Sequence, residues 1–338
     1  MKINVEENVL LKNYTTLKVG GVADYFVTVT SKEELTEALR FAKQTKIFPL
    51  LFGGGSNILV SDAGYRGLVI QNKITKRVDT VHGDNVYFAC GGGEVLDDVV
   101  ADSVSKNYWG LENLSAIPGS VGATPVQNVG AYGVEVSSLI TEVLAINIET
   151  LETKNFSNKN CSFSYRNSYF KTEPGKKWII TEVVFKLSLI NTPQLEYGSL
   201  QTLQKNEGVS IVDIRNEIIK IRSTKFPDWR KVGTAGSFFK NPIIPTKQFT
   251  ELLKKYPYIP GFPVGESMTK VSLGWILDHV CKLKGYGKDG VRLYQEQALV
   301  LINESSDSAE QINSFANYVA EVVKEKTGII IEREVTSV

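Results

Sequence analysis

The strongest chemical signal in the sequence is a run of three glycines followed by a serine and an asparagine, Gly53 to Asn57. Glycine has no Cβ and adopts left-handed backbone conformations, so consecutive backbone N–H groups can point into one concavity that a ligand approaches closely. Such a turn suits a pyrophosphate. A tight loop without a ligand has the same residue types, so both interpretations stay open.

A second candidate is the stretch from Ile117 to Gly133, which combines small residues, carboxamides and a tyrosine. Flat heteroaromatic rings with polar edges need walls in which the backbone comes close and amides match donors and acceptors. The stretch is too apolar for a linker, so we expect it to wrap a ligand. A buried connection is the alternative.

Three single side chains have types that could act on a bound ligand. Ser237 lies between a glycine and two phenylalanines, Arg166 follows Tyr165, and Glu334 lies close to the end of the sequence. Each has an ordinary explanation when taken alone, because serines occupy turns while arginines and glutamates are usually solvated.

Several familiar motifs are absent. Gly285 to Gly290 spells G-x-G-x-x-G but precedes a strand-like segment, whereas a dinucleotide fingerprint needs a strand before it and a helix after it. Gly53 to Asn57 lacks the Gly-Lys-Ser/Thr ending of a P-loop. Pro118 replaces the first glycine of a nucleophile elbow, and only His82 and His279 could serve as its base. These patterns argue against a Rossmann site, a Walker loop and a serine hydrolase.

A small α/β unit is predicted to position the glycine run. We expect a strand over Val22 to Thr30, a helix that begins with a capping box at Ser31 and ends near Thr45, and a strand over Phe48 to Phe52. The last strand leads directly into Gly53. The order strand, helix, strand indicates an α/β arrangement.

The rest of the chain predicts two further groups of elements. Strands over Val86–Cys90, Ile140–Ile148 and Trp178–Leu187, with a helix over Glu94–Lys106, indicate an α+β domain. The last third predicts helices from Val209 to Lys225, Ser272 to Val280 and Ala309 to Lys326, a helix stop at Gly328, and a terminal strand over Ile329–Val335.

Composition excludes several classes of protein. The 338 residues include 38 Lys and Arg against 37 Asp and Glu, so there is no basic field for nucleic acid and any anion must be bound locally. Three scattered cysteines argue against a disulfide framework and a zinc site, and we expect no metal. The scattered cysteines fit a reducing compartment, and the sequence shows neither a signal peptide nor a bilayer-spanning run, so we expect a cytoplasmic protein without membrane insertion. We also expect a monomer.

Taken together, the motifs resemble the UDP-N-acetylenolpyruvoylglucosamine reductase family, also called UDP-N-acetylmuramate dehydrogenase. The matching segments cover nearly the whole chain and are Gly53–Asn57, Gly110–Leu114, Ile117–Gly119, Gln127–Gly133, Tyr165–Ser168, Gly236–Pro242 and Gln297–Asn303.

The resemblance implies an α+β fold with a two-part FAD-binding module of the vanillyl-alcohol-oxidase (PCMH) type and a C-terminal α+β substrate domain. The expected parts are residues 1–72, 73–208 and 209–338, with the segment from about 328 to 338 returning to the flavin site. The resemblance also implies non-covalent FAD, because neither histidine lies in the glycine-rich stretches.

The implied reaction is reduction of the enolpyruvyl ether of UDP-N-acetylglucosamine to UDP-N-acetylmuramate by NADPH, a step of peptidoglycan synthesis on which cell shape and division depend. Hydride from the reduced flavin adds to the terminal enolpyruvyl carbon, and negative charge develops beside it. The family's arginine corresponds to Arg166, its proton-donating serine to Ser237 and its glutamate to Glu334. Donors arranged in advance are needed there.

The resemblance also assigns binding residues. Expected FAD contacts are Gly53, Gly54, Gly55, Ser56, Asn57, Pro118, Gly119, Gly122, Ala123, Thr124, Val126, Gln127 and Gly130. Expected UDP-sugar contacts are Tyr132, Tyr165, Tyr197, Lys225, Asn241, Lys284 and Gln297.

One position departs from the family. Members with a long third domain commonly carry a tyrosine on a loop that folds over the ligand, and Phe262 occupies that place here. Tyr256 or Tyr258 is a substitute. Two rival functions remain: another flavin oxidase or dehydrogenase on the same scaffold, which needs a base instead of Ser237, and a nucleotide-binding module without chemistry.

Overall fold

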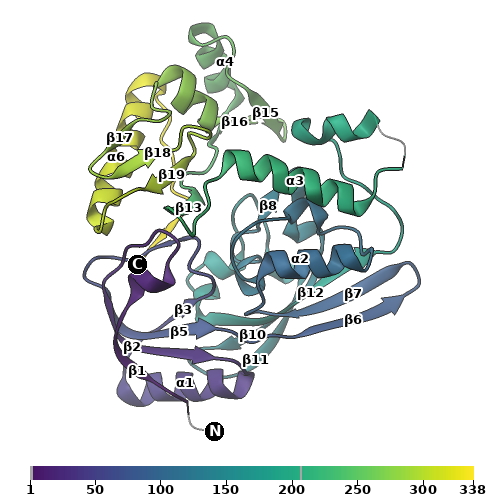
Figure 1. Cartoon of the computed structure of the whole chain (residues 1–338), viewed down its shortest axis with the longest axis vertical. Helices are drawn as coiled ribbons and strands as arrows, with labels where there is room; N and C mark the ends of the chain where they lie inside the picture. Colours follow the sequence, from purple (N-terminus) through teal and green to yellow (C-terminus); the bar gives the residue numbers. More distant parts are fainter. Residues whose placement is uncertain (1–2, 206–207) are drawn as a thin grey trace. The chain divides into compact units, whose positions relative to one another are not determined.

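The structure, a computed structural model, describes residues 3–205 and 208–338 (Figure 1). The chain forms two compact units. The first unit consists of Met1–Val9, Ala23–Gly55 and Tyr65–Arg222, and the second unit of Leu10–Val22, Ser56–Gly64 and Ser223–Val338. The division into three parts at residues 72 and 208 stays a prediction.

A four-stranded sheet in the first unit carries the glycine run. Its order is β1-β2-β5-β3, in which β2, β5 and β3 are parallel neighbours. Helix α1 lies along this sheet (Figure 1), and its buried apolar side chains pack against those of β2 and β5. The elements are β1 (Glu6–Leu10), β2 (Val22–Val29), α1 (Lys32–Thr45), β3 (Pro49–Phe52) and β5 (Tyr65–Asn72). The predicted strand, helix and strand are confirmed.

Helix α1 begins at the predicted capping box. The Ser31 hydroxyl accepts a hydrogen bond from the Glu34 backbone N–H at 3.1 Å. The Glu34 carboxylate accepts one from the Thr30 backbone N–H at 2.7 Å, and the hydrogen bonds from Thr30 hold the pKa of Glu34 below its ordinary value. The box therefore fixes the start of the helix by local chemistry.

The second sheet of the first unit has five strands, all antiparallel, in the order β11-β10-β12-β7-β6. The predicted strands and helices of this region are confirmed within a few residues. They are β6 (Arg77–His82), β7 (Asn85–Gly91), α2 (Leu96–Ser105), β10 (Ile140–Asn147), β11 (Thr153–Ser157), β12 (Trp178–Ser188) and α3 (Ile211–Lys225), with a short hairpin of β8 (Gly130–Ala131) and β9 (Val134–Glu135).

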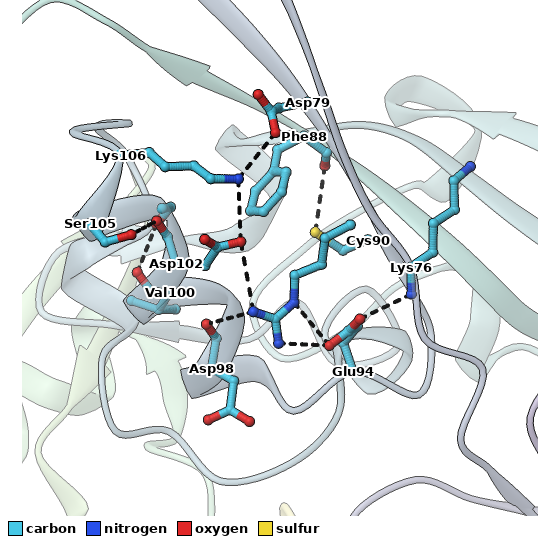
Figure 2. A network of polar contacts seen from close by, with 12 residues as sticks. Lys76, Asp79, Phe88, Cys90, Glu94, Asp98, Val100, Asp102, Ser105 and Lys106 are labelled. Atoms are coloured by element: carbon cyan, nitrogen blue, oxygen red, sulfur yellow. Dashed lines mark hydrogen bonds and ion pairs between the residues drawn. The ribbon is translucent and has the colours of Figure 1, made fainter.

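Ion pairs join strand β6 to helix α2 (Figure 2). The Arg77 guanidinium donates to Glu94 at 2.8 and 3.0 Å and lies 3.7 Å from Asp102, and Lys106 links Asp102 to Asp79 at 3.5 and 3.1 Å. Because the Glu94 side chain is only 9% exposed, its pair with Arg77 is partly desolvated. The network fixes helix α2 against the edge of the sheet.

The second unit contains two small sheets, a short pair of parallel strands and several helices. The sheets have the orders β13-β19-β18-β17 and β14-β16-β15. The elements are β13 (Gly233–Ser237), β14 (Ile243–Pro245), α4 (Thr246–Lys255), β15 (Gly261–Val264), β16 (Met268–Val271), α5 (Leu273–Trp275), a π-helix (Ile276–Val280), β17 (Gly287–Lys288), β18 (Val291–Leu293), β19 (Val300–Asn303) and α6 (Ala309–Thr327). Gly328 ends α6 in a left-handed conformation, as predicted.

The predicted terminal strand over Ile329–Val335 is wrong. The apolar residues Ile329, Ile331 and Val335 are buried, as apolar residues of a strand would be, but the segment is not a strand. No ladder forms along the segment; it makes single backbone bonds, such as Glu334 N–H to the Phe238 carbonyl at 2.8 Å. The strand lies later, at β20 (Thr336–Ser337), parallel to β4 (Ile58–Leu59). Strand propensity does not specify which edge is available for pairing.

The segment from Gly285 to Gly290 is not a dinucleotide fingerprint, as predicted. β17 and β18 form an antiparallel hairpin in which Lys288 pairs with Val291. The two residues between them, Asp289 and Gly290, have positive φ values of 52° and 77°. This is a two-residue turn with its usual Asp-Gly sequence.

Candidate active site

The two predicted cofactor loops touch each other within the first unit. A Cβ added to Gly54 would lie 3.1 Å from the Cα of Gly119, and one added to Gly53 would overlap the Ser120 hydroxyl. Backbone therefore approaches backbone at a distance that side chains would prevent. Amide groups from two segments lie next to each other, an arrangement that fits the pyrophosphate of a dinucleotide.

The other predicted FAD contacts are distributed over both units. Thr124 is buried and its hydroxyl donates to the Val121 carbonyl at 2.8 Å, so only its oxygen remains to accept from a ligand. Pro118 and Ala123 are exposed. Ser56 and Asn57 belong to the second unit. Those of the first unit are Gly53, Gly54, Gly55, Pro118, Gly119, Gly122, Ala123, Thr124, Val126, Gln127 and Gly130.

Arg166 is held by the backbone of the second loop. Its Nη2 donates to the Gly130 carbonyl at 2.9 Å and its Nη1 to the Asn128 carbonyl at 3.4 Å. Its guanidinium lies 5.5 Å from the centre of the Tyr165 ring. Arg166 itself has a left-handed backbone, with φ of 51°. The contacts fix a planar group that can bind a carboxylate through two parallel hydrogen bonds.

Tyr132 lies on the same short hairpin as Gly130. The hairpin pairs Ala131 with Val134, and Tyr132 and Gly133 form the turn. The Tyr132 ring is 8% exposed and packs edge-on against Tyr197 at 5.5 Å. Burial raises the pKa of Tyr132 above its ordinary value, and the positive charge of Arg222 opposes that effect. Two predicted substrate residues, Tyr132 and Tyr197, are thus brought together.

Ser237 and Glu334 are neighbours within the second unit. Ser237 ends β13 opposite Val300, and the next residue, Phe238, accepts the Glu334 N–H at 2.8 Å. The Asn57 carboxamide donates to the Glu334 carbonyl at 3.2 Å. Two predicted catalytic residues and one predicted cofactor residue are therefore linked by these hydrogen bonds. Arg166 belongs to the first unit.

The other predicted substrate residues of the second unit have fixed polar groups. The Asn241 side-chain oxygen accepts from the Leu273 N–H at 3.0 Å, and that of Gln297 from the Leu299 N–H at 3.3 Å. Both carboxamides therefore turn their NH₂ ends away from these backbone groups, as donors to a ligand. Lys284 forms an ion pair with Asp278 at 3.1 Å, and Lys225 is half-buried at the end of α3.

The candidate loop tyrosines differ in exposure. The Tyr256 hydroxyl donates to the Lys326 carbonyl at 3.2 Å, whereas Tyr258 is 83% exposed. Phe262 lies in β15 and is 56% exposed. An exposed aromatic side chain is available to a ligand, so Tyr258 and Phe262 are better candidates than Tyr256.

Sequence reasoning missed Arg222. It lies on α3, and its Nε donates to the Ala116 carbonyl at 3.1 Å. Burial lowers the pKa of Arg222, with Tyr132 and Asp97 opposing that effect. The isoleucine spacing that predicted α3 says nothing of these contacts. The only signal was a second arginine, Arg215, two helical turns earlier.

Two searches of the described part of the chain, residues 3–205 and 208–338, found no matching feature. No helix there is both long and apolar enough to span a bilayer. No cluster of three or more His, Cys, Asp or Glu side chains there is arranged to bind a metal ion.

Comparison with protein families gives two matches. A model described as an FAD binding domain matches residues 23–148. A model described as the C-terminal domain of UDP-N-acetylenolpyruvoylglucosamine reductase matches residues 228–338. The first match includes both touching glycine-rich loops, and the second includes Ser237 and Glu334.

Comparison with individual proteins covers the whole chain. The UDP-N-acetylenolpyruvoylglucosamine reductase of Flavobacterium johnsoniae is 40% identical, over 98% of this chain and 99% of that protein. The enzyme of the same name from Pasteurella multocida is 36% identical, over 96% and 94%. The crystal structure of UDP-N-acetylenolpyruvylglucosamine reductase (MurB) from Thermus caldophilus gives a TM-score of 0.70 with 25% identity, over 99% of both chains.

Proposed function

The chain belongs to the UDP-N-acetylenolpyruvoylglucosamine reductase family, and on that premise we propose that it reduces the enolpyruvyl ether of UDP-N-acetylglucosamine to UDP-N-acetylmuramate. FAD is the bound cofactor and NADPH the electron donor. The observation that carries the proposal is the close approach of Gly54 to the Gly119 backbone, and of Gly53 to the Ser120 side chain, inside the region that matches an FAD binding domain.

The two loops would hold FAD through their backbone amides. Bound FAD supplies the hydride that it receives from NADPH. Non-covalent binding is supported by the sequence, because the loops contain no histidine. Glycine at positions 53 and 54 permits the close approach of the loops, and a side chain at either position would separate them.

Arg166 would bind the substrate carboxylate. When hydride adds to the terminal enolpyruvyl carbon, charge develops on the neighbouring carbon and spreads into the carboxylate. A guanidinium fixed by the Asn128 and Gly130 carbonyls is oriented before that charge forms, so it stabilises the transition state with little rearrangement.

Ser237 would deliver the proton that completes the reduction. The bonds balance: hydride forms one C–H bond, the hydroxyl proton forms the other, and the C=C π bond is lost. Ser237 then recovers a proton from solvent. Its position is fixed by pairing with Val300, and Glu334 lies one backbone hydrogen bond from the adjoining Phe238. Glu334 would assist as a protonated acid or as a hydrogen-bond partner.

The UDP moiety would be bound by the remaining polar residues. Carboxamide NH₂ groups of Asn241 and Gln297 are donors suited to diphosphate oxygens, and lysines supply charge. The residues proposed for the UDP-sugar are Tyr132, Tyr165, Tyr197, Lys225, Asn241, Lys284 and Gln297. Since NADPH and UDP-sugars are used inside the cell, we also propose a cytoplasmic location, and we expect a monomer.

The test is anaerobic addition of NADPH, and then of the enolpyruvyl UDP-sugar, to the purified yellow protein while its visible spectrum is followed. We expect NADPH to bleach the flavin and the UDP-sugar to restore it. Bleaching without restoration would favour a different flavin oxidoreductase. A colourless protein that NADPH leaves unchanged would favour a nucleotide-binding module.

Ser237→Ala tests the proton donor. We expect this variant to keep FAD and to be reduced by NADPH, while reoxidation by the enolpyruvyl UDP-sugar slows by about 1,000-fold, within the range of lost proton transfer and lost electrostatic stabilisation. Stopped-flow absorbance measures both half-reactions. Reoxidation at the wild-type rate would remove Ser237 from the mechanism.

A further inference from the structure

The segment that carries Glu334 is not held by a strand ladder. It meets the backbone that follows Ser237 at one isolated bridge, in which Arg333 is paired with Phe239. Next to this bridge, the Glu334 N–H donates to the Phe238 carbonyl at 2.8 Å. Isolated backbone contacts open more readily than a ladder of them. The position of Glu334 therefore depends on what else holds the segment.

The side chain of Arg333 supplies additional contacts by binding helix α6. Its Nη1 donates to the Asn313 side-chain oxygen at 2.6 Å. Its Nη2 donates to the Asn317 side-chain oxygen at 2.8 Å and to the Asn313 backbone carbonyl at 3.2 Å. Because Asn313 and Asn317 are four residues apart in one helix, they lie on the same face of it. The planar guanidinium is therefore bound by three acceptors in one orientation.

The Arg333 guanidinium also lies against an aromatic ring. Its central carbon is 5.7 Å from the centre of the Phe238 ring, within the range of a cation–π contact. Phe238 is fully buried, and its ring packs against Phe239 at 5.3 Å. Phe238 directly follows Ser237 in the chain. Arg333 thus links α6 to the residue next to the proposed proton donor.

Each group that accepts a hydrogen bond from Arg333 is uncharged. The acceptors are two side-chain amide oxygens and one backbone carbonyl. Partial burial disfavours the charged form and lowers the pKa of Arg333. The arrangement therefore uses the rigid fork of an arginine, which sets direction, and not the attraction between opposite charges.

The segment is bound on the other side of Glu334 as well. The Asn57 side chain donates to the Glu334 carbonyl at 3.2 Å, and the Thr336 N–H donates to the Asn57 carbonyl at 3.1 Å. Glu334 therefore lies between two points of attachment, Arg333 before it and Asn57 after it. All of these contacts are within the second unit.

We propose that Arg333 is a positioning residue for the reduction, which fixes Glu334 next to Ser237 by binding α6 and the Phe238 ring. This inference rests on the proposed function, because it takes Ser237 and Glu334 as the groups that complete the reduction. A pair of groups that is already aligned needs little rearrangement when the proton moves. Loss of the alignment should slow that proton transfer and leave ligand binding intact.

Arg333→Met in the FAD-loaded full chain is the first test, because methionine has an unbranched side chain and no donor. We expect NADPH to reduce the flavin within about 2-fold of the wild-type rate, and the Kd of UDP-N-acetylmuramate to stay within about 2-fold. Reoxidation by the enolpyruvyl UDP-sugar should slow by about 30-fold, a loss that a misplacement of less than about 1 Å can cause. Arg333→Lys should recover part of the rate, since an ammonium donates to fewer of the acceptors. Reoxidation at the wild-type rate in Arg333→Met, or equal slowing of both half-reactions, would overturn the proposal.

Asn317→Ala separates positioning from stability. Alanine favours the helix, which offsets part of the lost hydrogen bond, so the melting temperature should change little. Reoxidation should still slow by about 3-fold, because Arg333 loses one acceptor. The double variant with Arg333→Met should be no slower than Arg333→Met alone, because Asn317 acts through Arg333. Losses that multiply in the double variant would contradict this mechanism.

Lys324→Met is the matched control on the same helix. Lys324 forms an exposed ion pair with Glu321 at 3.7 Å, and such pairs contribute little. Both half-reactions should stay within about 2-fold of wild type. If Lys324→Met slowed reoxidation as much as Arg333→Met, the effect would belong to helix α6 as a whole and the proposal would be wrong.

A last measurement needs no substrate. Hydrogen exchange, followed by mass spectrometry on peptides covering residues 329–338, reports opening of the backbone contacts around Glu334. We expect exchange to be about 10-fold faster in Arg333→Met and unchanged in Lys324→Met. Unchanged exchange in Arg333→Met would show that Arg333 does not hold the segment. If the wild-type protein did not reduce the enolpyruvyl UDP-sugar, the proposed function would fail, while the exchange result would still decide whether Arg333 fixes Glu334.

Discussion

Two hairpin turns in this chain follow the same backbone path with different residues. Tyr132–Gly133 has φ values of 49° and 87°, and Asp289–Gly290 has 52° and 77°. The second turn has the Asp-Gly sequence that positive φ favours, and Asp289 is exposed. The first turn has a tyrosine in the same position, and that tyrosine is buried against Tyr197.

The difference separates local from tertiary causes. The Asp289–Gly290 turn satisfies its own backbone preference and only has to connect β17 to β18. The Tyr132–Gly133 turn violates that preference and is supported by packing of the Tyr132 ring against Tyr197. A position that breaks a local rule and is supported by distant residues is one where function is expected. Matched substitutions at the two turns therefore test whether the Tyr132–Gly133 turn belongs to the active site.

The largest expected effect concerns the arginines attached to the two hairpins. Arg166 bonds the Gly130 carbonyl beside the first turn, and Arg292 bonds the Gly285 carbonyl and Glu304 beside the second. We expect Arg166→Lys to lower kcat/KM by about 1,000-fold, roughly 4 kcal/mol, since one ammonium cannot reproduce a bidentate fork. Steady-state kinetics with the enolpyruvyl UDP-sugar measures it.

Arg292→Lys is the matched control. It makes the same substitution on the other hairpin, where the partner is an exposed glutamate, and kcat/KM should stay within about 2-fold of wild type. Equal losses in both variants would indicate general destabilisation. Wild-type turnover in Arg166→Lys would mean that a different residue binds the carboxylate.

The elements that were predicted best are those that depend on neighbouring residues in the chain. Strands, α1 with its capping box at Ser31, and the helix stop at Gly328 follow from residues close together in the chain, and these were confirmed. The Asp289–Gly290 hairpin was not predicted, although its Asp-Gly sequence is a local turn signal of the same kind. Local patterns suffice where a few neighbouring residues supply the hydrogen bonds.

The candidate site required information of a different kind. Arg166, Ser237 and Glu334 were identified by resemblance to a family, because each residue type alone has an ordinary explanation. Arg222 was missed because the partner of its hydrogen bond, the Ala116 carbonyl, lies 106 positions away in the sequence. The wrong strand at Ile329–Val335 has the same origin: alternating burial is local, whereas an available strand edge is a property of the tertiary fold.

An intermediate effect is expected when the two turn glycines are replaced. A Cβ at Gly290 would lie 2.7 Å from the Ser305 hydroxyl and 2.9 Å from the Ser306 nitrogen, whereas one at Gly133 meets only Tyr197, at 3.8 Å. We expect Gly290→Ala to lower the free energy of unfolding by about 3 kcal/mol and Gly133→Ala by about 1 kcal/mol. Alanine disfavours positive φ at both positions, and only at Gly290 does its Cβ also clash with neighbouring atoms.

Thermal unfolding monitored by circular dichroism checks both variants. Gly133→Ala should lose more affinity for UDP-N-acetylmuramate than Gly290→Ala, although it loses less stability, because it distorts the Tyr132 turn. If Gly290→Ala lost more affinity as well as more stability than Gly133→Ala, the distinction between a functional and a connecting turn would be wrong.

The smallest effect concerns the ion pair between Asp97 and Arg215 of α3. Burial opposes ionisation of Asp97, but hydrogen bonds from Arg215 and the Ala116 N–H, with the charges of Arg215 and Arg222, hold the pKa of Asp97 below its ordinary value. A folded-state pKa below the unfolded value stabilises the protein above the unfolded pKa, and this stability is lost as pH falls through the folded pKa. Asp97→Asn should therefore cost about 1 kcal/mol at pH 7, discounted because the side chain is about one-third exposed, and the difference should disappear at low pH. Urea unfolding at several pH values measures it, with Asp289→Asn at the other turn expected within about 0.5 kcal/mol of wild type throughout. A pH-independent loss in Asp97→Asn would mean that its carboxylate charge does not support α3.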